Sequence, residues 1–163
     1  MTTKTKPYFL TREGLARLTE ELAVLKTNGR QKLAERLRLA FQDGQDDDFV
    51  DNAELEAARN EQAFMEGRIQ DLEQILSNYQ IIDEIDVPHD TVNIGAKITV
   101  VEEGYDDEEE YLLVGPAEAD VINGRISNES PLGAALLGSK IGDIVRVKAP
   151  RGETVFRVKQ ISY

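Results

Sequence analysis

Residues 43–54 read Asp43-Gly44-Gln45-Asp46-Asp47-Asp48-Phe49-Val50-Asp51-Asn52-Ala53-Glu54, with six carboxylates and no basic residue. One apolar pattern typical of a helix ends at this stretch, and a second one starts from it. A short connection between two helices makes an antiparallel hairpin, so the sequence places these residues, called the tip loop below, at the end of a hairpin. Six like charges contribute nothing to a core. The tip loop is therefore either simply solvated or carried outward to deliver carboxylates.

The chain before the tip loop predicts a helix from Thr11 to about Phe41. Thr11 offers an N-cap, and apolar residues then recur at steps of three and four, the spacing of a coiled coil. They are Leu15, Leu18, Leu22, Leu25, Leu33, Leu37 and Ala40. The repeat breaks at Gly29 and resumes out of phase, which alters a supercoil locally and need not end the helix.

The chain after the tip loop predicts a second helix that ends near Ser77-Asn78. Asp51 and Glu54 have the spacing of a capping box. A regular heptad pattern follows at Leu55, Ala58, Gln62, Met65, Ile69, Leu72, Leu76 and Tyr79. The two helices together predict a coiled-coil hairpin about 40 Å long.

The pattern changes after Tyr79, where β-branched residues and the turn signal Val87-Pro88-His89-Asp90 appear. We expect domains at residues 1–79 and 80–163. The second contains four predicted strands, at residues 97–101, 110–114, 144–147 and 154–158, and a short helix at 131–138. The predicted class is α+β, a helical hairpin followed by a small antiparallel sheet.

Composition excludes several classes of function. The formal net charge of -12 argues against free duplex nucleic acid or an anionic membrane as the main partner. The absence of cysteine excludes disulfides, thiol catalysis and Cys-type zinc sites. The first residues resemble no signal peptide and no stretch is apolar enough to span a membrane, so we expect a cytoplasmic protein.

The tip loop has three interpretations. Asp51 and Glu54 fit helix capping, which leaves Asp46, Asp47 and Asp48 unexplained. A calcium loop of the EF-hand kind has ligand positions from Asp43 onward, but its sixth position is not glycine. In the third interpretation the loop lends carboxylates to a magnesium ion held by another molecule, as a second ion in phosphodiester cleavage requires.

The remaining candidates have ordinary explanations. His89, the one histidine, follows Pro88 in a turn and is expected to be a surface residue. The acidic run at 106–110 is most simply a solvated hairpin end. A basic stretch along the first helix is either a solvated face or a surface for RNA phosphates. It comprises Lys26, Arg30, Lys32, Arg36 and Arg38.

Several motifs in register resemble the bacterial Gre family of transcript cleavage factors (the GreA/GreB type), over nearly the whole chain. They are Leu10-Thr11-Arg12-Glu13-Gly14-Leu15, Asn52-Ala53-Glu54, Phe64-Met65-Glu66-Gly67-Arg68-Ile69, Glu118-Ala119-Asp120, Ser130-Pro131-Leu132-Gly133, Ala135-Leu136-Leu137-Gly138 and Pro150-Arg151-Gly152-Glu153.

The resemblance implies a coiled-coil domain followed by a globular domain of FKBP-like fold. It implies a monomeric factor that is not itself an enzyme and binds no cofactor alone. The globular domain of such factors docks at the rim of the RNA polymerase secondary channel, and the coiled coil reaches the active site. Two acids there share a magnesium ion with the polymerase, which cleaves backtracked RNA and restores a usable 3′ end.

Carried over to this chain, the resemblance places the two metal-holding acids at Asp48 and Asp51. Asp51 stands where the family has Glu, three residues are extra after Gly44, and Phe41 lies where a basic residue is common. The resemblance implies accessory roles at the tip for Asp46, Asp47, Phe49, Asn52 and Glu54. It implies positions near RNA for Arg36, Arg38 and Arg59. It implies contact with the polymerase for Ser130, Pro131, Leu132 and Leu136.

Two functions within this family follow from the resemblance. The first is stimulation of transcript cleavage through Asp48 and Asp51. The second is a Gre-like inhibitor or pausing factor, whose enlarged acidic tip blocks nucleotide addition. A third hypothesis, a coiled-coil adaptor outside transcription, requires that the chain does not bind RNA polymerase.

Overall fold

The computed structural model describes residues 6–43, 53–82, 86, 88–150 and 152–163. The chain divides into two compact units. One is Leu15–Ser77, which we call the arm. The other, the sheet unit, combines the start of the chain through Gly14 with Asn78–Tyr163. The second junction lies close to the expected boundary at 79/80, whereas the sequence did not predict that the N-terminal segment joins the sheet unit.

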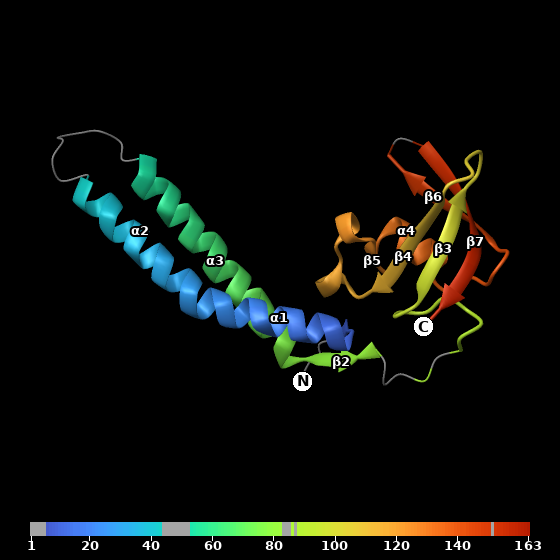
Figure 1. The fold of residues 1–163 in the computed structure, drawn as a ribbon, viewed down its shortest axis with the longest axis horizontal. Helices are drawn as coiled ribbons and strands as arrows, with labels where there is room; N and C mark the ends of the chain where they lie inside the picture. The colour runs from blue at the N-terminus through green and yellow to red at the C-terminus, as the bar shows by residue number, and fades with distance from the viewer. Residues whose placement is uncertain (1–5, 44–52, 83–85, 87, 151) are drawn as a thin grey trace, which may run out of the picture. The chain divides into compact units, whose positions relative to one another are not determined.

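The arm is a hairpin of long helices (Figure 1). Helix α1 (Arg12–Val24) continues through a π-helical turn, η1 (Leu25–Gly29), into α2 (Arg30–Asp43). Helix α3 (Ala53–Ser77) packs along α2. Both predicted helices are therefore confirmed, including the end of the second one at Ser77. No helix in the described part of the chain has the length and apolar character needed to cross a membrane.

The break in the apolar repeat at Gly29 corresponds to the π-helical turn. A π turn closes its hydrogen bonds one residue later than an α turn, so it shifts the phase of the side chains while the helix continues. A Cβ atom at Gly29 would lie 3.1 Å from the Met65 sulfur in α3. The glycine therefore allows η1 and α3 to approach closely.

The apolar residues of the two repeats form the interior of the arm. Leu33, Ala58, Met65 and Ile69 make one buried cluster, and Leu22, Leu25 and Leu37 pack against it. The heptad assignment fails at two positions. Gln62 is exposed, and Tyr79 lies beyond the helix in a strand.

The sheet unit begins with a pair of short strands. Strand β1 (Tyr8–Leu10) pairs in parallel with β2 (Tyr79–Ile81), and Leu10 is fully buried. The main sheet has five strands in the order β5-β4-β3-β7-β6. They are β3 (Lys97–Glu102), β4 (Glu108–Val114), β5 (Arg125–Ser127), β6 (Ile144–Ala149) and β7 (Gly152–Ser162).

All four predicted strands of the second half are confirmed, but the expectation of an antiparallel sheet was only partly correct. The pairs β3–β4, β3–β7 and β6–β7 are antiparallel, whereas β4 and β5 are parallel. Two short 3-10 helices, η3 (Pro116–Glu118) and η4 (Val121–Asn123), lie on the connection between β4 and β5. This connection allows the chain to return in the same direction as β4, so the sheet is mixed.

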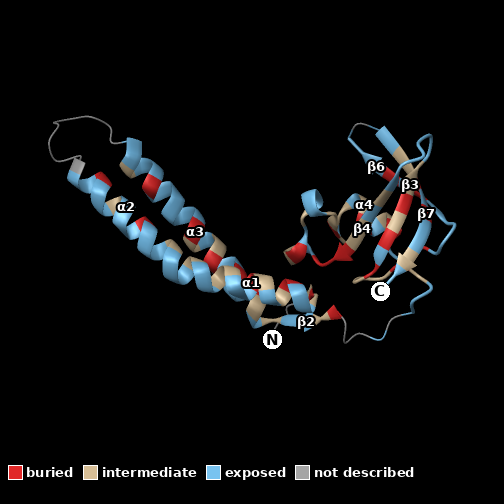
Figure 2. Ribbon diagram, in the orientation of Figure 1, coloured by how far each residue is buried: buried red, intermediate tan, exposed pale blue. Residues whose placement is uncertain are grey.

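Buried residues alternate with more exposed ones along β3 and β6, and they form part of the core of the sheet unit (Figure 2). The core includes Ile98, Leu113, Phe156 and Val158. Helix α4 (Pro131–Leu136), which confirms the predicted short helix, packs against β5 and β6 and buries Leu136 in this core.

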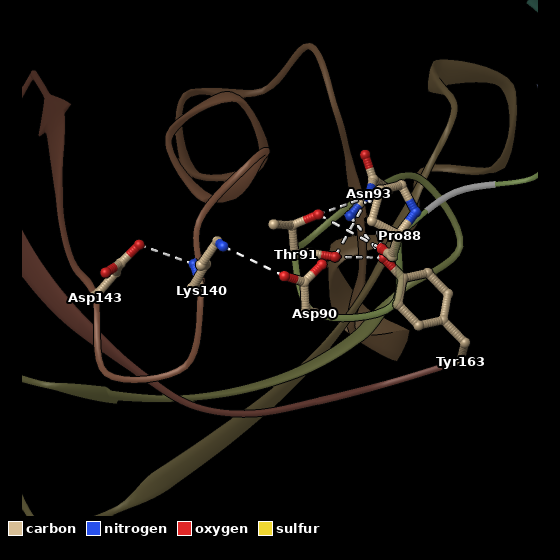
Figure 3. Close-up of polar contacts among 7 residues, drawn as sticks. All are labelled: Pro88, Asp90, Thr91, Asn93, Lys140, Asp143 and Tyr163. Atoms are coloured by element: carbon tan, nitrogen blue, oxygen red, sulfur yellow. Dashed lines mark hydrogen bonds and ion pairs between the residues drawn. The ribbon is translucent and has the colours of Figure 1, made fainter.

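The C-terminal residue is tied to the segment that precedes β3 (Figure 3). The Tyr163 hydroxyl donates a hydrogen bond to the Thr91 carbonyl oxygen (2.6 Å) and accepts one from the Asn93 amide (2.9 Å). His89 is exposed, as expected, and its ring stacks on that of Tyr163 with centroids 4.6 Å apart. These contacts give the single histidine a structural explanation.

Candidate functional site

The tip loop connects the end of α2 at Asp43 with the start of α3 at Ala53. Most of its candidate residues lie outside the described part of the chain, so their roles and the Asp51 cap stay predictions. These residues are Asp46, Asp47, Asp48, Phe49, Asp51 and Asn52. Their donor chemistry fits magnesium, since that ion takes one or two carboxylates and keeps several waters.

An aromatic contact joins the two helices next to the tip loop. The Phe41 ring on α2 is about half exposed, and the Arg59 guanidinium of α3 lies over it at 5.7 Å from the ring centroid. A cation over an aromatic face is attracted by the ring quadrupole. Arg59, predicted to lie near RNA, is therefore held by Phe41 in the free protein.

Arg36 connects α2 with two carboxylates of α3. Its Nε donates to Glu54 at 2.7 Å, and one terminal nitrogen donates to Glu61. The hydrogen bond to Glu54 is the main cause that raises the pKa of Arg36 above its usual value. Glu54, an accessory residue of the tip loop, thus ties the start of α3 to α2.

Three further cations of the basic stretch, Lys26, Arg30 and Arg38, also face carboxylates. Arg38 pairs with Glu35 on its own helix and donates to Gln42. Two further pairs cross to α3: Lys26 with Glu73, and Arg30 with Glu66 at 2.7 and 2.9 Å. The hydrogen bond from Arg30 lowers the pKa of Glu66. The contacts favour a structural explanation of this stretch over a surface for RNA phosphates.

The expected docking residues are grouped at α4 of the sheet unit. The Ser130 hydroxyl accepts from the Gly133 amide (3.1 Å), which caps the helix, and donates to the Ser127 carbonyl (2.6 Å). Pro131 is exposed and Leu132 half-buried, whereas Leu136 is fully buried. Leu136 is a core residue with no surface to offer a partner, so the predicted docking role can apply only to Ser130, Pro131 and Leu132, for which it stays a prediction.

An exposed apolar pair on η4 was not singled out from the sequence. The exposed fractions of Val121 and Ile122 are 74% and 96%. Asp120 holds the turn through Asn123 and Arg125, whose side chains donate to it at 2.7 and 2.8 Å. The residues around Val121 and Ile122 show no periodic apolar pattern. The sequence therefore gave no indication that these two apolar side chains are exposed.

Among the residues that the structure describes, no group of three or more His, Asp or Glu side chains is arranged to hold a metal ion.

Two family models match the chain, one in each half. The model described as "Transcription elongation factor, N-terminal" matches residues 8–81, and the one described as "Transcription elongation factor, GreA/GreB, C-term" matches residues 87–163.

Similar proteins cover nearly the whole chain. "Transcription elongation factor GreA" of Thermoanaerobacter pseudethanolicus is 48% identical, over 96% of this chain and 98% of the relative. The protein of that name from Clostridium botulinum is 44% identical, over 96% of both. The crystal structure of GreA factor homolog 1 (Gfh1) of Thermus thermophilus is 32% identical, over 97% of this chain and 100% of that one, with a TM-score of 0.40. The family models and the sequence relatives agree: this chain belongs to the GreA/GreB family of transcription elongation factors.

Proposed function

We propose that this chain binds RNA polymerase through its secondary channel and stimulates the polymerase's own cleavage of backtracked RNA. Asp48 and Asp51 are the residues that would act at the polymerase active site. The membership of the GreA/GreB family and the relatives named GreA at 44–48% identity support this function over inhibition.

The construction of the arm is the observation that supports the proposal most strongly. Buried side chains and cross-helix ion pairs hold α2 and α3 together up to the pair of Arg36 with Glu54, the last residue of the tip loop. At 1.5 Å per residue, the 25 residues of α3 extend roughly 37 Å. A braced hairpin of this length can carry its connecting loop into a narrow channel without folding back.

The charge of the arm is concentrated in the tip loop. Residues 15–77 contain fourteen acidic and eight basic residues, and six of the acids lie at 43–54. The rest of the arm is therefore balanced. An arm that is electrically balanced except for its anionic tip loop suits the delivery of carboxylates to a site that already holds a cation.

In the proposed mechanism, Asp48 and Asp51 contribute oxygen ligands to a magnesium ion shared with the polymerase. When bound, that ion helps to activate water for attack on the phosphodiester. The factor's part is to position the two carboxylates. Asp51 is one methylene shorter than Glu, and misplacement of a catalytic group by about 1 Å strongly reduces rates.

Docking in this proposal falls to the sheet unit. Pro131 and the exposed part of Leu132 are the candidate contacts at α4, and the η4 pair of Val121 and Ile122 supplies a second exposed apolar surface. This adjacent pair is a candidate contact for a protein partner.

The test uses purified RNA polymerase in stalled, backtracked elongation complexes. RNA length is followed after addition of the wild-type protein, Asp48→Asn or Asp51→Asn. We expect shortened RNA with the wild type and a loss of about 100-fold or more in cleavage rate with either variant. Asp107→Asn, an exposed acid in the sheet unit, is the matched control and should cleave like the wild type.

Three results would contradict the proposal. Unchanged RNA length together with slowed nucleotide addition would identify an inhibitor or pausing factor. Cleavage that survives both substitutions would remove Asp48 and Asp51 from the mechanism. Failure to bind RNA polymerase would return the chain to the adaptor hypothesis.

A further inference from the structure

A buried carboxylate in the sheet unit meets the start of the first helix. Glu118 lies on η3, and only 3% of its surface is exposed. Its two carboxylate oxygens accept hydrogen bonds from Thr11, one from the backbone amide (2.6 Å) and one from the hydroxyl (2.8 Å). Thr11 immediately precedes α1. Two residues 107 positions apart in the sequence therefore meet at a helix N-terminus.

Thr11 passes this contact on to the first turn of α1. Its hydroxyl oxygen accepts a hydrogen bond from the Gly14 amide (2.9 Å), which confirms the predicted N-cap. One hydroxyl thus donates to Glu118 and accepts from the helix. Amide groups at a helix start have no partner inside the helix, and a negative charge there is favoured by the helix dipole.

The contact leaves no space for a side chain on Gly14. A Cβ atom at this position would lie 1.7 Å from Glu118 Oε1. Alanine is normally preferred over glycine inside a helix. At this position glycine is needed because it allows the Glu118 carboxylate to approach closely.

The backbone that carries Glu118 is itself fixed against the N-terminal strand. The Glu118 amide donates to the Gly115 carbonyl (3.1 Å). A Cβ atom at Gly115 would lie 2.5 Å from the Phe9 carbonyl oxygen, so β1 and η3 are in close contact. Both ends of the Glu118–Thr11 contact are therefore anchored within the sheet unit.

A buried ionised carboxylate is costly unless hydrogen bonds compensate for the loss of water. Within the described ranges, Glu118 is the only charged side chain among the buried residues. The fold thus places a carboxyl group where it has lost most of its contact with water. Its hydrogen bonds to Thr11 give a reason for keeping it.

We propose that Glu118 and Thr11 are a positioning pair that fixes the first turn of α1 in the sheet unit. Helix α1 continues without interruption from this turn into the arm. A turn that frays would loosen the base of the continuous helical segment α1-η1-α2, which ends at Asp43, the first residue of the tip loop. The pair would then determine how productively the carboxylates reach the polymerase site, so this inference rests on the proposed function.

The test compares Thr11→Val and Glu118→Gln with Thr11→Ser and Thr19→Val. Thr11→Val removes the hydroxyl at nearly constant volume, and Thr11→Ser restores it. Thr19→Val is a matched control on the same helix, because the Thr19 hydroxyl donates only within its helix, to the Leu15 carbonyl (2.7 Å). Each protein is first checked for wild-type helix content.

Two readouts are required. Amide hydrogen exchange in the free protein should be about tenfold faster at Gly14 in Thr11→Val, and near wild type in Thr11→Ser and Thr19→Val. At saturating factor, Thr11→Val and Glu118→Gln should slow RNA cleavage about tenfold, while the concentration that gives half-maximal effect stays unchanged.

Other outcomes overturn the inference. Unchanged exchange at Gly14 would show that the pair does not hold the turn. Faster exchange with wild-type cleavage would show that the turn does not position the arm, and an equal loss of rate and affinity would assign the pair to docking. If the wild type itself stimulates no cleavage, the proposed function fails, and the positioning role fails with it. The exchange data still decide separately whether the anchor exists.

Discussion

Two helical glycines of this protein have opposite surroundings. Gly14 meets the Glu118 carboxylate, whereas a Cβ atom at Gly67 in α3 would touch nothing within 4 Å. In an exposed helix interior, alanine is preferred over glycine by about 1 kcal/mol. Gly67→Ala should therefore raise the free energy of unfolding by about that amount, while Gly14→Ala should lower it, because the new methyl group displaces a buried, hydrogen-bonded carboxylate.

Urea denaturation followed by circular dichroism measures both effects. Gly67→Ala serves as the control for helix propensity, since it changes the same atoms in an open position. If Gly14→Ala were as stabilising as Gly67→Ala, the close approach of Glu118 would have no energetic importance.

Tyr111 of β4 has a strongly raised pKa. Burial, and next the hydrogen bond that its hydroxyl donates to Glu109, raise its pKa to about 12. The unfolded chain ionises near pH 10, so the folded state holds this proton more tightly. The stability that Tyr111 contributes is complete below pH 10 and is lost as pH rises from about 10 to about 12.

Ultraviolet titration of tyrosinate detects this residue among the five tyrosines. The difference between the wild type and Tyr111→Phe should titrate near pH 12, and the free energy of unfolding of Tyr111→Phe should depend less on pH above 10. A difference spectrum that titrates at pH 10 would show that Tyr111 is solvated.

At the scale of elements, the helices of the arm are joined by paired charges as well as by apolar packing. Arg68 of α3 makes two parallel hydrogen bonds to Glu21 of α1, at 2.7 and 2.8 Å, and both side chains are just over one-third exposed. This geometry is more favourable than that of most surface pairs. Arg38 and Glu35 form a similar pair within α2, where the helix itself already sets their spacing.

A double-mutant cycle with alanine should give a coupling of about 1 kcal/mol for Arg68–Glu21 and about 0.3 kcal/mol for Arg38–Glu35. Both couplings should shrink in about 1 M salt, where exposed charges are screened. Equal couplings for the two pairs would mean that the cross-helix pair adds nothing to the hairpin.

Most elements were predictable because their patterns are local. The leucine repeats indicated both helices, and short runs of β-branched, aromatic and leucine residues indicated β3, β4, β6 and β7. The three-residue strands β1, β2 and β5 are too short to show a period, and the parallel pairing of β5 depends on how the chain turns after Pro116. A phase break at Gly29 indicated the irregular turn without specifying its π-helical form.

The candidate site was predictable to a smaller extent. The acidic tip loop stands out from composition alone, while the choice of Asp48 and Asp51 within it came from family resemblance. The sequence left the basic stretch on the first helix open between a solvated face and a surface for RNA, because its partners, including Glu66 and Glu73, are far away in the sequence. Glu118 has the same problem, since nothing around it in the sequence indicates that Thr11 is its neighbour.

At the scale of the whole molecule, charge determines which partners are possible. The chain has a formal net charge of -12. Arg30, Arg36 and Arg38 on the arm already contact carboxylates, and Arg59 contacts an aromatic ring. A protein that binds duplex DNA directly gains affinity by releasing counterions from phosphates through free Lys and Arg side chains. Here, few such side chains are available on the arm.

We therefore expect no measurable binding of the isolated chain to free duplex DNA or to single-stranded RNA at about 0.15 M salt, as followed by fluorescence anisotropy. The double variant Glu54→Gln/Glu61→Gln provides the comparison, because it removes both carboxylates that Arg36 contacts. It should bind RNA more tightly than the wild type at low salt, with a steeper dependence on salt concentration. Micromolar binding by the wild type would mean that the arm's cations exchange their carboxylates for phosphates freely. Nucleic acid could then recruit the factor directly, whereas weak binding leaves RNA polymerase as the partner that brings the tip loop to the transcript.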